Sequence, residues 1–398
     1  MRILLLTDWN REHGGSERYV AELRDALARD GDDVRLLTSS AGDAGHGTAD
    51  YVAYGSNSRL VQAGLQLHNP FATATIRRAV KEFRPDVALV FMFALQLSPG
   101  ALRALGEVPK LIAISDYKPI CPVSTRLLPD RSLCNEDEGL ACLRNGCVGP
   151  AHWLRDQPRY RLIRRALRNA DQIITCSEWM KDELAVRGVH ADCVPLASHP
   201  PPPSFTREPS AEPTFLYRGR LDAEKGVDIV LQALASLRRE CPATRLDILG
   251  RGPMQSDLEA LTAALGLSDS VVFHGWKQGD EMWPFLSRAW AQVVPSLWAE
   301  PLGLVAVESV LCGVPTIVSR KGGLAEIVGH CRGGLQVDNG DVEGWKNAMA
   351  TIAVKDHFSD QRVADEDVAA TQRKYDWQQH VREIRQRCRA VASDRDNR

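Results

Sequence analysis

The chain has 398 residues, of which 44% are hydrophobic, and a formal net charge of −2. This length exceeds what one ordinary hydrophobic core supports and suits two domains. The near-neutral charge predicts no attraction of the whole chain to nucleic acid or anionic lipid. The sequence has no apolar run near the ~18 residues of a membrane span, and the apolar run in MRILLLTDWN is too short for a signal peptide. We therefore expect a cytoplasmic protein, which could still work at the inner face of the membrane.

The first half of the chain alternates short apolar runs with amphipathic segments. Residues 3–6 have the length of a strand, and apolar residues at helical spacing follow over 19–27 until Gly31. With a strand at 34–37, this order makes a strand–helix–strand unit. The pattern repeats with strands predicted at 87–91, 111–114 and 172–175.

A Pro-rich stretch, 199–213, interrupts this alternation. Four consecutive prolines at 200–203 cannot donate backbone hydrogen bonds and favour an extended spacer. We predict a first domain at 1–198, with a Cys-containing insertion at 117–150, and a second domain at 214–374.

After the spacer the alternation restarts, which predicts two doubly wound α/β domains. Because ligands bind beyond the carboxyl ends of parallel strands, we expect the site in a cleft between the domains. The segment 375–398 carries an amphipathic helix, over 375–388, with Trp377, Val381 and Ile384 on one side, which could pack on the first domain. The second domain is predicted to contain strands at 215–218, 245–249, 271–274, 291–295, 316–319 and 335–337, and helices at 227–237 and 256–265.

The stretch SLWAEPLGLVAVES, 296–309, places two acids around a predicted helix entrance. Glu300 precedes the helix and Glu308 lies within it. Free N–H groups near Gly303 and Leu304 would form an anion site, and the two acids could accept hydrogen bonds from hydroxyls on either side of it. A nucleotide sugar has this chemistry. Alternatively, one acid interacts with the helix dipole and the other pairs with an arginine.

Two further loops join a strand to a helix. YRGRLDAEKG, 217–226, carries Arg220 and Lys225, which could both reach a diphosphate, although a turn with solvated charges would look the same. HGGSE, 13–17, contains Gly14 and Gly15, which would let the backbone approach a ligand, or would form a plain helix-entry turn. The first strand is not followed by the G-x-G-x-x-G of a dinucleotide-binding fold.

Together these motifs resemble family 4 glycosyltransferases. The resemblance covers most of the chain and is strongest over 215–328. Its carriers, in order, are Gly14-Gly15-x-Glu17, the loop from Gly219-Arg220 to Lys225-Gly226, Gly250-x-Gly252-Pro253, Phe273-x-Gly275, Glu300-x7-Glu308 and Gly322-Gly323-x-x-Glu326.

The resemblance implies a GT-B fold, in which two Rossmann-like domains face each other. It also implies metal-independent transfer of a hexose-type sugar, with retention of configuration, from a UDP or GDP donor to a hydroxyl of a glycan, glycolipid or small molecule. No cofactor beyond the nucleotide sugar is expected. By matching positions, Arg220 and Lys225 would hold the diphosphate. Glu300 and the N–H groups of 302–304 (Leu302, Gly303, Leu304) would contact the sugar, and Glu308 would bind the ribose. Val272 and Phe273 would lie against the base, Gly14 and Gly15 would border the sugar-diphosphate, and Gly219 would also bind the donor.

One departure from the family pattern lies at 113–122, AISDYKPICP. The family usually has His-Asp-Tyr before Cys-Pro, and the His position is Ser115 here, whereas Asp116 remains. The polar contact to the donor sugar could pass to Ser115 or Asp116, the donor could differ, or the activity could be reduced. His13 is another candidate to replace it, although a lone loop histidine is usually solvated.

Four cysteines and an Arg-rich segment are two further groups of residues that could have a function. Cys121, Cys134, Cys142 and Cys147 could bind a structural zinc ion, but their spacing lacks C-x2-C pairs, so disulfides or free thiols are the alternatives. The Arg-rich segment 155–168 could form a basic helix at a membrane surface near a lipid-linked acceptor, or a solvated helix face.

Three other functions share parts of this pattern. A nucleotide-sugar epimerase or sugar phosphorylase would use the same architecture. A non-catalytic sugar-nucleotide-binding protein would explain the loss of the family histidine at Ser115. A nicotinamide-dependent dehydrogenase is disfavoured because the dinucleotide fingerprint is missing.

Overall fold

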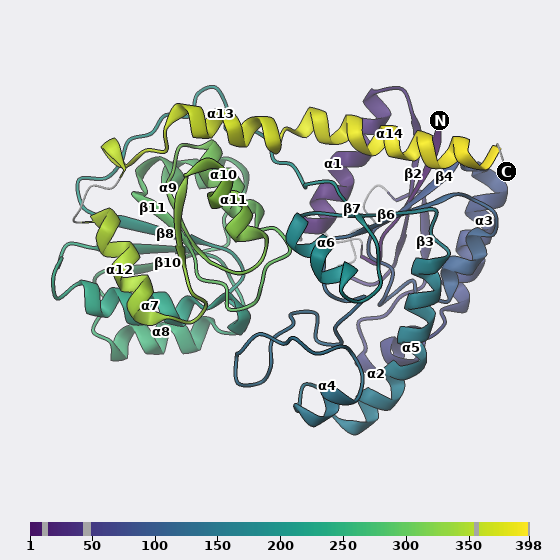
Figure 1. Cartoon of the computed structure of the whole chain (residues 1–398), viewed down its shortest axis with the longest axis horizontal. Coiled ribbons are helices and arrows are strands. Elements are labelled where there is room, and N and C mark those ends of the chain that lie inside the picture. The colour runs from purple at the N-terminus through teal and green to yellow at the C-terminus, as the bar shows by residue number, and fades with distance from the viewer. Residues whose placement is uncertain (10–14, 43–48, 354–357, 397–398) are drawn as a thin grey trace.

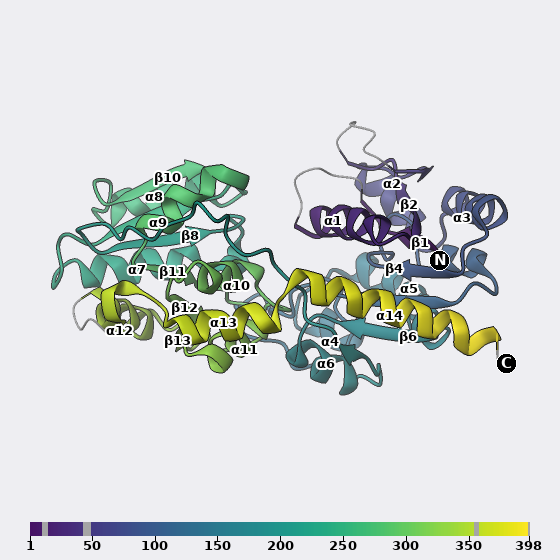
Figure 2. The same ribbon diagram turned by 90° about the horizontal axis from the view of Figure 1, so that it is seen from above.

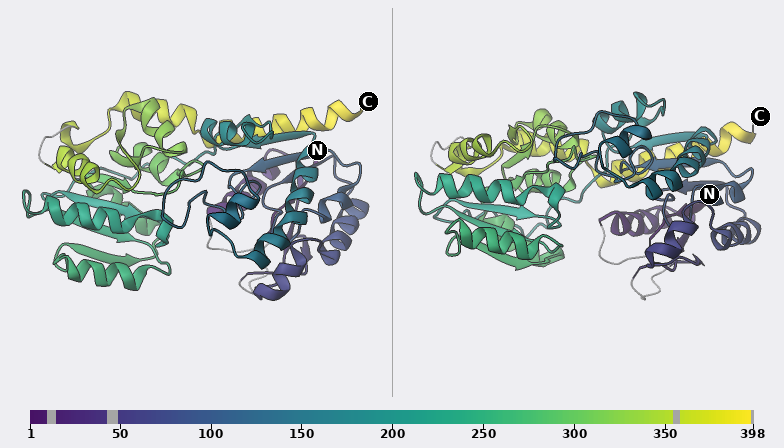
Figure 3. Two further views of the ribbon diagram at one scale, coloured as in Figure 1. Left: turned by 60° about the horizontal axis from the view of Figure 1, so that its bottom comes forward. Right: turned by 90° about the horizontal axis from the view of Figure 1, so that it is seen from below.

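The structure is a computed structural model that describes residues 1–9, 15–42, 49–353 and 358–396. It contains two parallel β-sheets, each flanked by helices, in two lobes that lie side by side (Figure 1). The predicted fold class, two doubly wound α/β domains, is therefore confirmed. Figure 3 shows the same two lobes from two further directions, with chain segments that cross between them.

The first sheet has seven parallel strands in the order β3-β2-β1-β4-β5-β6-β7. The central strand β4 is buried along its whole length, as expected of a parallel sheet covered on both faces. The two edge strands, β3 and β7, have only three and two residues, too few for a periodic pattern, and the sequence did not predict them. The strands are β1 (Arg2–Leu6), β2 (Asp33–Ser39), β3 (Tyr51–Ala53), β4 (Val87–Val90), β5 (Lys110–Ile114), β6 (Gln172–Thr175) and β7 (Asp192–Cys193).

Two helices of the first lobe begin at a residue whose side chain caps them. The Asn69 side chain accepts hydrogen bonds from the backbone N–H groups of Phe71 and Ala72, and Pro70 occupies the first helical position of α3. Ser177 caps α6 in the same way by accepting from the N–H of Met180. The helices are α1 (Gly15–Arg29), α2 (Arg59–Leu65), α3 (Pro70–Phe83), α4 (Leu140–Arg144), α5 (Pro150–Arg168) and α6 (Glu178–Ala185).

The second sheet has six parallel strands in the order β10-β9-β8-β11-β12-β13. The most apolar predicted helix, 227–237, is observed as α7 and buries seven side chains against this sheet. The strands are β8 (Thr214–Arg218), β9 (Arg245–Leu249), β10 (Val271–Gly275), β11 (Ala291–Val294), β12 (Thr316–Ser319) and β13 (Gly334–Val337). The helices are α7 (Val227–Leu237), α8 (Gln255–Ala264), α9 (Trp283–Arg288), α10 (Leu304–Leu311), α11 (Gly323–Cys331), α12 (Val342–Ala353) and α13 (Asp365–Lys374).

The Pro-rich stretch 199–213 contains no helix or strand, but its second half is not a free spacer. The guanidinium of Arg207 donates to the backbone carbonyls of Leu286, Ser287, Ala289 and Gln361. Burial lowers the pKa of this arginine to about 10. The stretch is therefore fastened to the second lobe.

The C-terminal segment crosses back to the first lobe. Helix α13 packs on α10 and α11 of the second lobe, and α14 (Trp377–Asp396) lies along α1, β4 and β5 of the first (Figure 2). Trp377, Val381 and Ile384 are all buried in the first lobe's core. The helix begins at Trp377, since Asp376 accepts from the N–H of Gln379, and it ends eight residues later than predicted.

Candidate active site

Two neighbouring cavities lie between the lobes, at the carboxyl ends of the strands. The first, which we call the Glu300 cavity, has a volume of about 380 Å³, and the second, the Glu308 cavity, about 350 Å³. Gly15, Tyr19 and Leu304 line both, so the two cavities form one cleft. The cavities lie where the sequence predicts the site, beyond the strand ends and between the domains, and their role as the site stays a prediction.

The Glu300 loop leaves β11 and enters α10 through a tight turn. Gly303 has φ +99°, and a Cβ there would lie 2.3 Å from a methyl carbon of Leu324. Gly322 has φ +90°, and a Cβ there would lie 2.5 Å from the carbonyl oxygen of Glu300. The N–H of Gly323 donates to that same carbonyl at 2.8 Å. Both glycines are therefore needed for the loop to seat Glu300 against the entrance of α11.

Lys225 and Glu300 form an ion pair at the centre of the cleft. The Lys225 Nζ lies 2.8 Å from Oε1 of Glu300, with 17% and 9% of their side chains exposed. Burial opposes ionisation of the carboxyl, but the charge and hydrogen bond of Lys225, with a hydrogen bond from Ser296, outweigh it and lower the pKa of Glu300. The Lys225 ammonium also lies 5.2 Å from the ring centroid of Trp298. The pair is thus fixed, charged and open to the cavity.

Glu308 lies within α10, eight residues after Glu300, and lines the Glu308 cavity. Its Oε2 accepts from Arg218 Nη1 at 2.9 Å. Arg218 is buried and held by Gln292 Oε1 at 2.8 Å and by the carbonyl of Val305 at 3.0 Å. A third of the Glu308 side chain stays exposed to the cavity. The alternative interpretation of this acid, an arginine partner, therefore holds, and the exposed part leaves it able to accept further hydrogen bonds.

The first turn of α10 supplies backbone donors to the cleft. The helix starts at Leu304, and the first N–H groups of a helix have no acceptor within it, although that of Ala306 donates to the carbonyl of Gly303 at 2.9 Å. Gly303 and Leu304 line the Glu300 cavity next to Lys225. A cation and a helix N-terminus thus converge on one place, an arrangement that suits an anion.

The first lobe contributes a more apolar wall. Phe91, Ala113 and Ile174 line the Glu300 cavity together with half-buried Ser115 and Asp116. The carboxylate of Asp116 accepts from the N–H of Lys118 at 3.0 Å and keeps its other oxygen 4.0 Å from that lysine's Nζ.

Asp8, a buried acid that sequence reasoning missed, holds the segment that follows β4 but lines neither cavity. Asp8, at the carboxyl end of β1, accepts from the N–H groups of Leu95, Gln96 and Leu97 at 2.8–2.9 Å. Burial raises its pKa despite these bonds. Its place directly after the first strand was the available signal.

Several predicted site residues are not brought into the cleft. Arg220 lines neither cavity; 63% of its side chain is exposed, and it pairs with Asp222 at 2.8 Å and Glu224 at 3.4 Å. Val272 and Phe273 lie within the edge strand β10 and also line neither cavity. Gly15 lines both cavities and Gly219 the Glu308 cavity, whereas Gly14 and His13 lie outside the described residues.

The loop after β10 lines the Glu308 cavity instead. Trp276, with 39% of its surface exposed, is followed by Lys277 and Gln278, and Met282 and Trp283 complete this wall. Sequence reasoning stopped at the strand, although Gly275 at its carboxyl end marked the turn into these residues.

The four cysteines of the insertion are free thiols in the structure. Among the described residues, no group of three or more His, Cys, Asp or Glu side chains is placed to hold a metal ion. Burial raises the pKa of Cys142 and of Cys147. Of the three possibilities, a zinc site, disulfides and free thiols, the arrangement of the described residues matches free thiols.

The Arg-rich segment is largely the helix α5, and part of its charge is neutralised. Buried Arg159 lies 3.5 Å from buried Asp156, which Arg155 also contacts, and Arg164 pairs with Glu138. Arg161, Arg165 and Arg168 remain exposed. In the described part of the chain, no helix is long and apolar enough to cross a membrane.

Two family models match the chain one after the other: "Glycosyltransferase Family 4" at residues 13–199 and "Glycosyl transferases group 1" at 203–364. The chain belongs to the family 4 glycosyltransferases. The predicted resemblance is therefore confirmed.

The curated relatives match only part of the chain. Glycogen synthase from Mycobacterium tuberculosis is 35% identical over 228 residues, 53% of this chain and 52% of that protein. A GDP-mannose-dependent alpha-(1-6)-phosphatidylinositol monomannoside mannosyltransferase from Mycolicibacterium smegmatis is 34% identical over 158 residues, 38% of this chain and 40% of that one. The chain thus matches about half the length of these relatives or less.

Solved structures resemble this family 4 member over its whole length. Sucrose-phosphate synthase from Thermosynechococcus elongatus superposes with a TM-score of 0.74 and 22% identity, covering 99% of both chains. Anabaena Alr3699/HepE in complex with UDP gives 0.69 and 17%, covering 98% of this chain and 100% of that one. These similarities show the expected GT-B fold.

Proposed function

We propose that this protein transfers a hexose-type sugar, with retention of configuration, from a UDP or GDP donor to a hydroxyl of a glycan, glycolipid or small molecule. The observation that carries the proposal is the Lys225–Glu300 pair beside the N-terminus of α10, inside the cleft. Relatives supply the donor classes, since one solved structure holds UDP-glucose and one relative is GDP-mannose-dependent.

The chemistry follows from the charges in the Glu300 cavity. Cleavage of a glycosyl–phosphate bond builds negative charge on the leaving diphosphate, and a fixed cation and N–H groups stabilise it most in that state. Lys225 and the first turn of α10 would supply both, while the Glu300 carboxylate would accept from sugar hydroxyls. Arg220 would have to swing from its two acids to join them. The acceptor's proton would pass to the leaving phosphate oxygen on the same face, so no separate base is needed.

The nucleoside would occupy the Glu308 cavity. Glu308 would accept from the ribose hydroxyls with its exposed part. Val272 and Phe273 line neither cavity, whereas the loop 276–279 lines the Glu308 cavity. The base would therefore lie against this loop, where the Trp276 ring could stack on it.

The acceptor would approach from the first lobe, past Ser115 and Asp116. A peripheral contact with the inner face of the membrane would rest on exposed Arg161, Arg165 and Arg168 of α5 rather than on the whole Arg-rich segment.

A thermal-unfolding panel with UDP, GDP, ADP, CMP and dTDP, followed by their sugar conjugates, tests the donor. A ligand at ~100 times its Kd adds about 2.7 kcal/mol of stability. Specific stabilisation by UDP or GDP, with nucleotide release when acceptors are added, is expected. Stabilisation without release for any acceptor would indicate a binding protein, and an epimerised donor an epimerase. If no nucleotide stabilises the folded protein, the proposal is wrong.

A further inference from the structure

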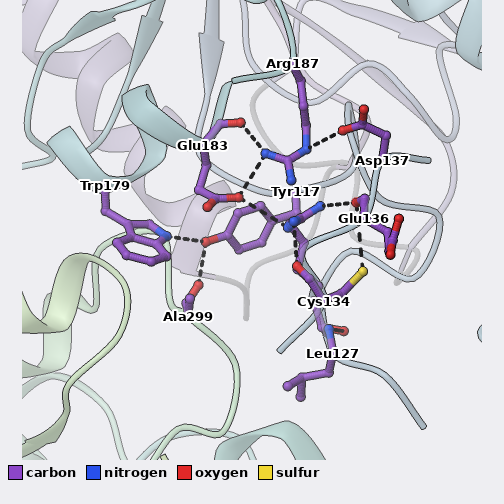
Figure 4. Close-up of polar contacts among 11 residues, drawn as sticks. Tyr117, Leu127, Cys134, Glu136, Asp137, Trp179, Glu183, Arg187 and Ala299 are labelled. Carbon is purple, nitrogen blue, oxygen red and sulfur yellow. Dashed lines mark hydrogen bonds and ion pairs between the residues drawn. The ribbon is translucent and has the colours of Figure 1, made fainter. Parts of the chain in front are cut away.

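Tyr117 is a first-lobe side chain that contacts the second lobe's Glu300 loop. It follows Asp116, and its side chain is completely buried. The hydroxyl donates to the backbone carbonyl of Ala299 at 2.7 Å and accepts from the indole N–H of Trp179 at 3.0 Å (Figure 4). Ala299 directly precedes Glu300, so this hydrogen bond holds the backbone from which the acid projects.

The ring of Tyr117 also contacts Trp298, the aromatic side chain beside Lys225. It meets the Trp298 ring edge-to-face, with centroids 5.9 Å apart. The Lys225 ammonium lies 5.2 Å from the centroid of the Trp298 ring. One tyrosine thus contacts the supports of both members of the ion pair, one through the backbone and one through an aromatic ring.

The surroundings keep Tyr117 in this position. Ser177 donates to the carbonyl of Pro301, on the far side of Glu300. Glu326 of α11 accepts from the N–H groups of Glu178 and Trp179 at the start of α6. These contacts fix the backbone of Trp179, and the indole N–H of the same residue donates to the Tyr117 oxygen.

The insertion that follows Tyr117 also binds both lobes. Arg126 donates to the carbonyls of Cys134 and Glu136 and lies 3.3 Å from Glu183 of α6. Beyond it, Arg131 makes a two-pronged ion pair with Asp228 of α7, at 2.7 and 2.8 Å. Movement of the second lobe would therefore be transmitted to the segment that carries Tyr117.

We propose that Tyr117 is a positioning residue that sets Lys225 and Glu300 from the first lobe, so that the ion pair adopts its reactive geometry only when the two lobes are together. This rests on the proposed glycosyl transfer. Tyr117 touches no reacting atom. Its hydroxyl acts through Ala299 and its ring acts through Trp298.

The test is Tyr117→Phe, with Tyr160→Phe as the matched control. Tyr160 is also buried in the first lobe, and its hydroxyl donates to the Lys118 carbonyl at 3.4 Å, without contact to the second lobe's loop. We expect kcat to fall about tenfold in Tyr117→Phe with little change in donor KM, because the interaction serves the transition state. Tyr160→Phe should stay near the wild-type rate.

Two readouts separate positioning from general stability. With a looser ion pair, burial should dominate the Glu300 carboxyl, so the acidic limb of the kcat–pH profile should move to higher pH in Tyr117→Phe. Amides over 296–304 should exchange about tenfold faster in Tyr117→Phe than in wild type or Tyr160→Phe. Trp179→Phe, which removes the donor to the Tyr117 oxygen, should give a smaller effect of the same kind.

Hydrogen exchange needs no substrate, so the two proposals fail separately. If the wild-type protein transfers no sugar, the proposed function is wrong, and unchanged exchange over 296–304 would refute the positioning role on its own. If transfer is observed, wild-type kcat and an unmoved acidic limb in Tyr117→Phe would overturn the positioning role.

Discussion

The two walls of the cleft are built differently. The second-lobe wall presents fixed ion pairs, Lys225–Glu300 and Arg218–Glu308, each at 2.8–2.9 Å and joined to glycine-dependent turns. The first-lobe wall is mainly apolar around Ser115 and Asp116. A wall of preset charges suits one chemical group, the diphosphate and its sugar, because fixed charges are costly to rearrange. On the proposed function, the apolar wall with few polar groups would receive the acceptor.

The largest expected effect is on the second-lobe wall. Glu300→Gln keeps the shape of the side chain but removes its charge, and turnover should fall about 100-fold, the usual cost of losing one preorganised group. Steady-state nucleotide release measures this. Glu343→Gln, an exposed acid on α12, is the control. A variant within fivefold of wild type would place the reaction elsewhere.

Loss of charge at the Glu308 cavity should act on binding. Glu308→Gln weakens a charge-assisted hydrogen bond, so the Kd for the nucleoside diphosphate should rise about tenfold, with kcat at saturation little changed. Titration calorimetry gives both the Kd and the stoichiometry. Unchanged affinity would remove the ribose role.

The prediction for the first lobe concerns how its stability depends on pH. His380 of α14 is buried against the Tyr19 hydroxyl at 2.7 Å, and burial lowers its pKa to about 4 from 6.5. The unfolded chain therefore binds the proton first, and stability is lost as the pH falls from 6.5 towards 4. Between pH 7 and 5.5 the loss should be about 1 kcal/mol, measured by urea unfolding.

His380→Gln is the control for this pH dependence. The glutamine does not titrate, so this part of the slope should vanish. A slope that persists unchanged would assign the effect to another group.

The smallest effect is expected at the position that departs from the family pattern. Ser115→Ala removes one hydroxyl from the cavity wall and should lower turnover about threefold, the value of one ordinary hydrogen bond. Comparison with Asp116→Asn sharpens the assignment. No effect in the first and a clear loss in the second would show that Asp116 makes the sugar contact.

The sequence was informative where a motif lies at a strand end. All six strands described in the second lobe, and the placement of Lys225, Glu300 and Glu308 on the cleft, follow from alternation and glycine positions. Their partners did not follow: the lysine and Glu300 are 75 residues apart, and the Arg218–Glu308 pair joins a strand to a helix 90 residues later. Such pairing depends on sheet order, which periodicity does not contain. Arg220 shows the converse, since its local motif fits but two nearby acids hold it outside the cavities.

The two crossings between the lobes lie beside each other. The N–H of Ser198 donates to the carbonyl of Tyr375 at 3.1 Å, and Ser198 forms a parallel bridge with Asp376. The chain therefore enters and leaves the second lobe at one place, as a two-stranded hinge. Opening of the cleft would concentrate its backbone rotation there and leave both sheets rigid. A cross-link between these two strands would slow entry and release of substrates without touching either ion pair, although Ser198 lines the Glu308 cavity.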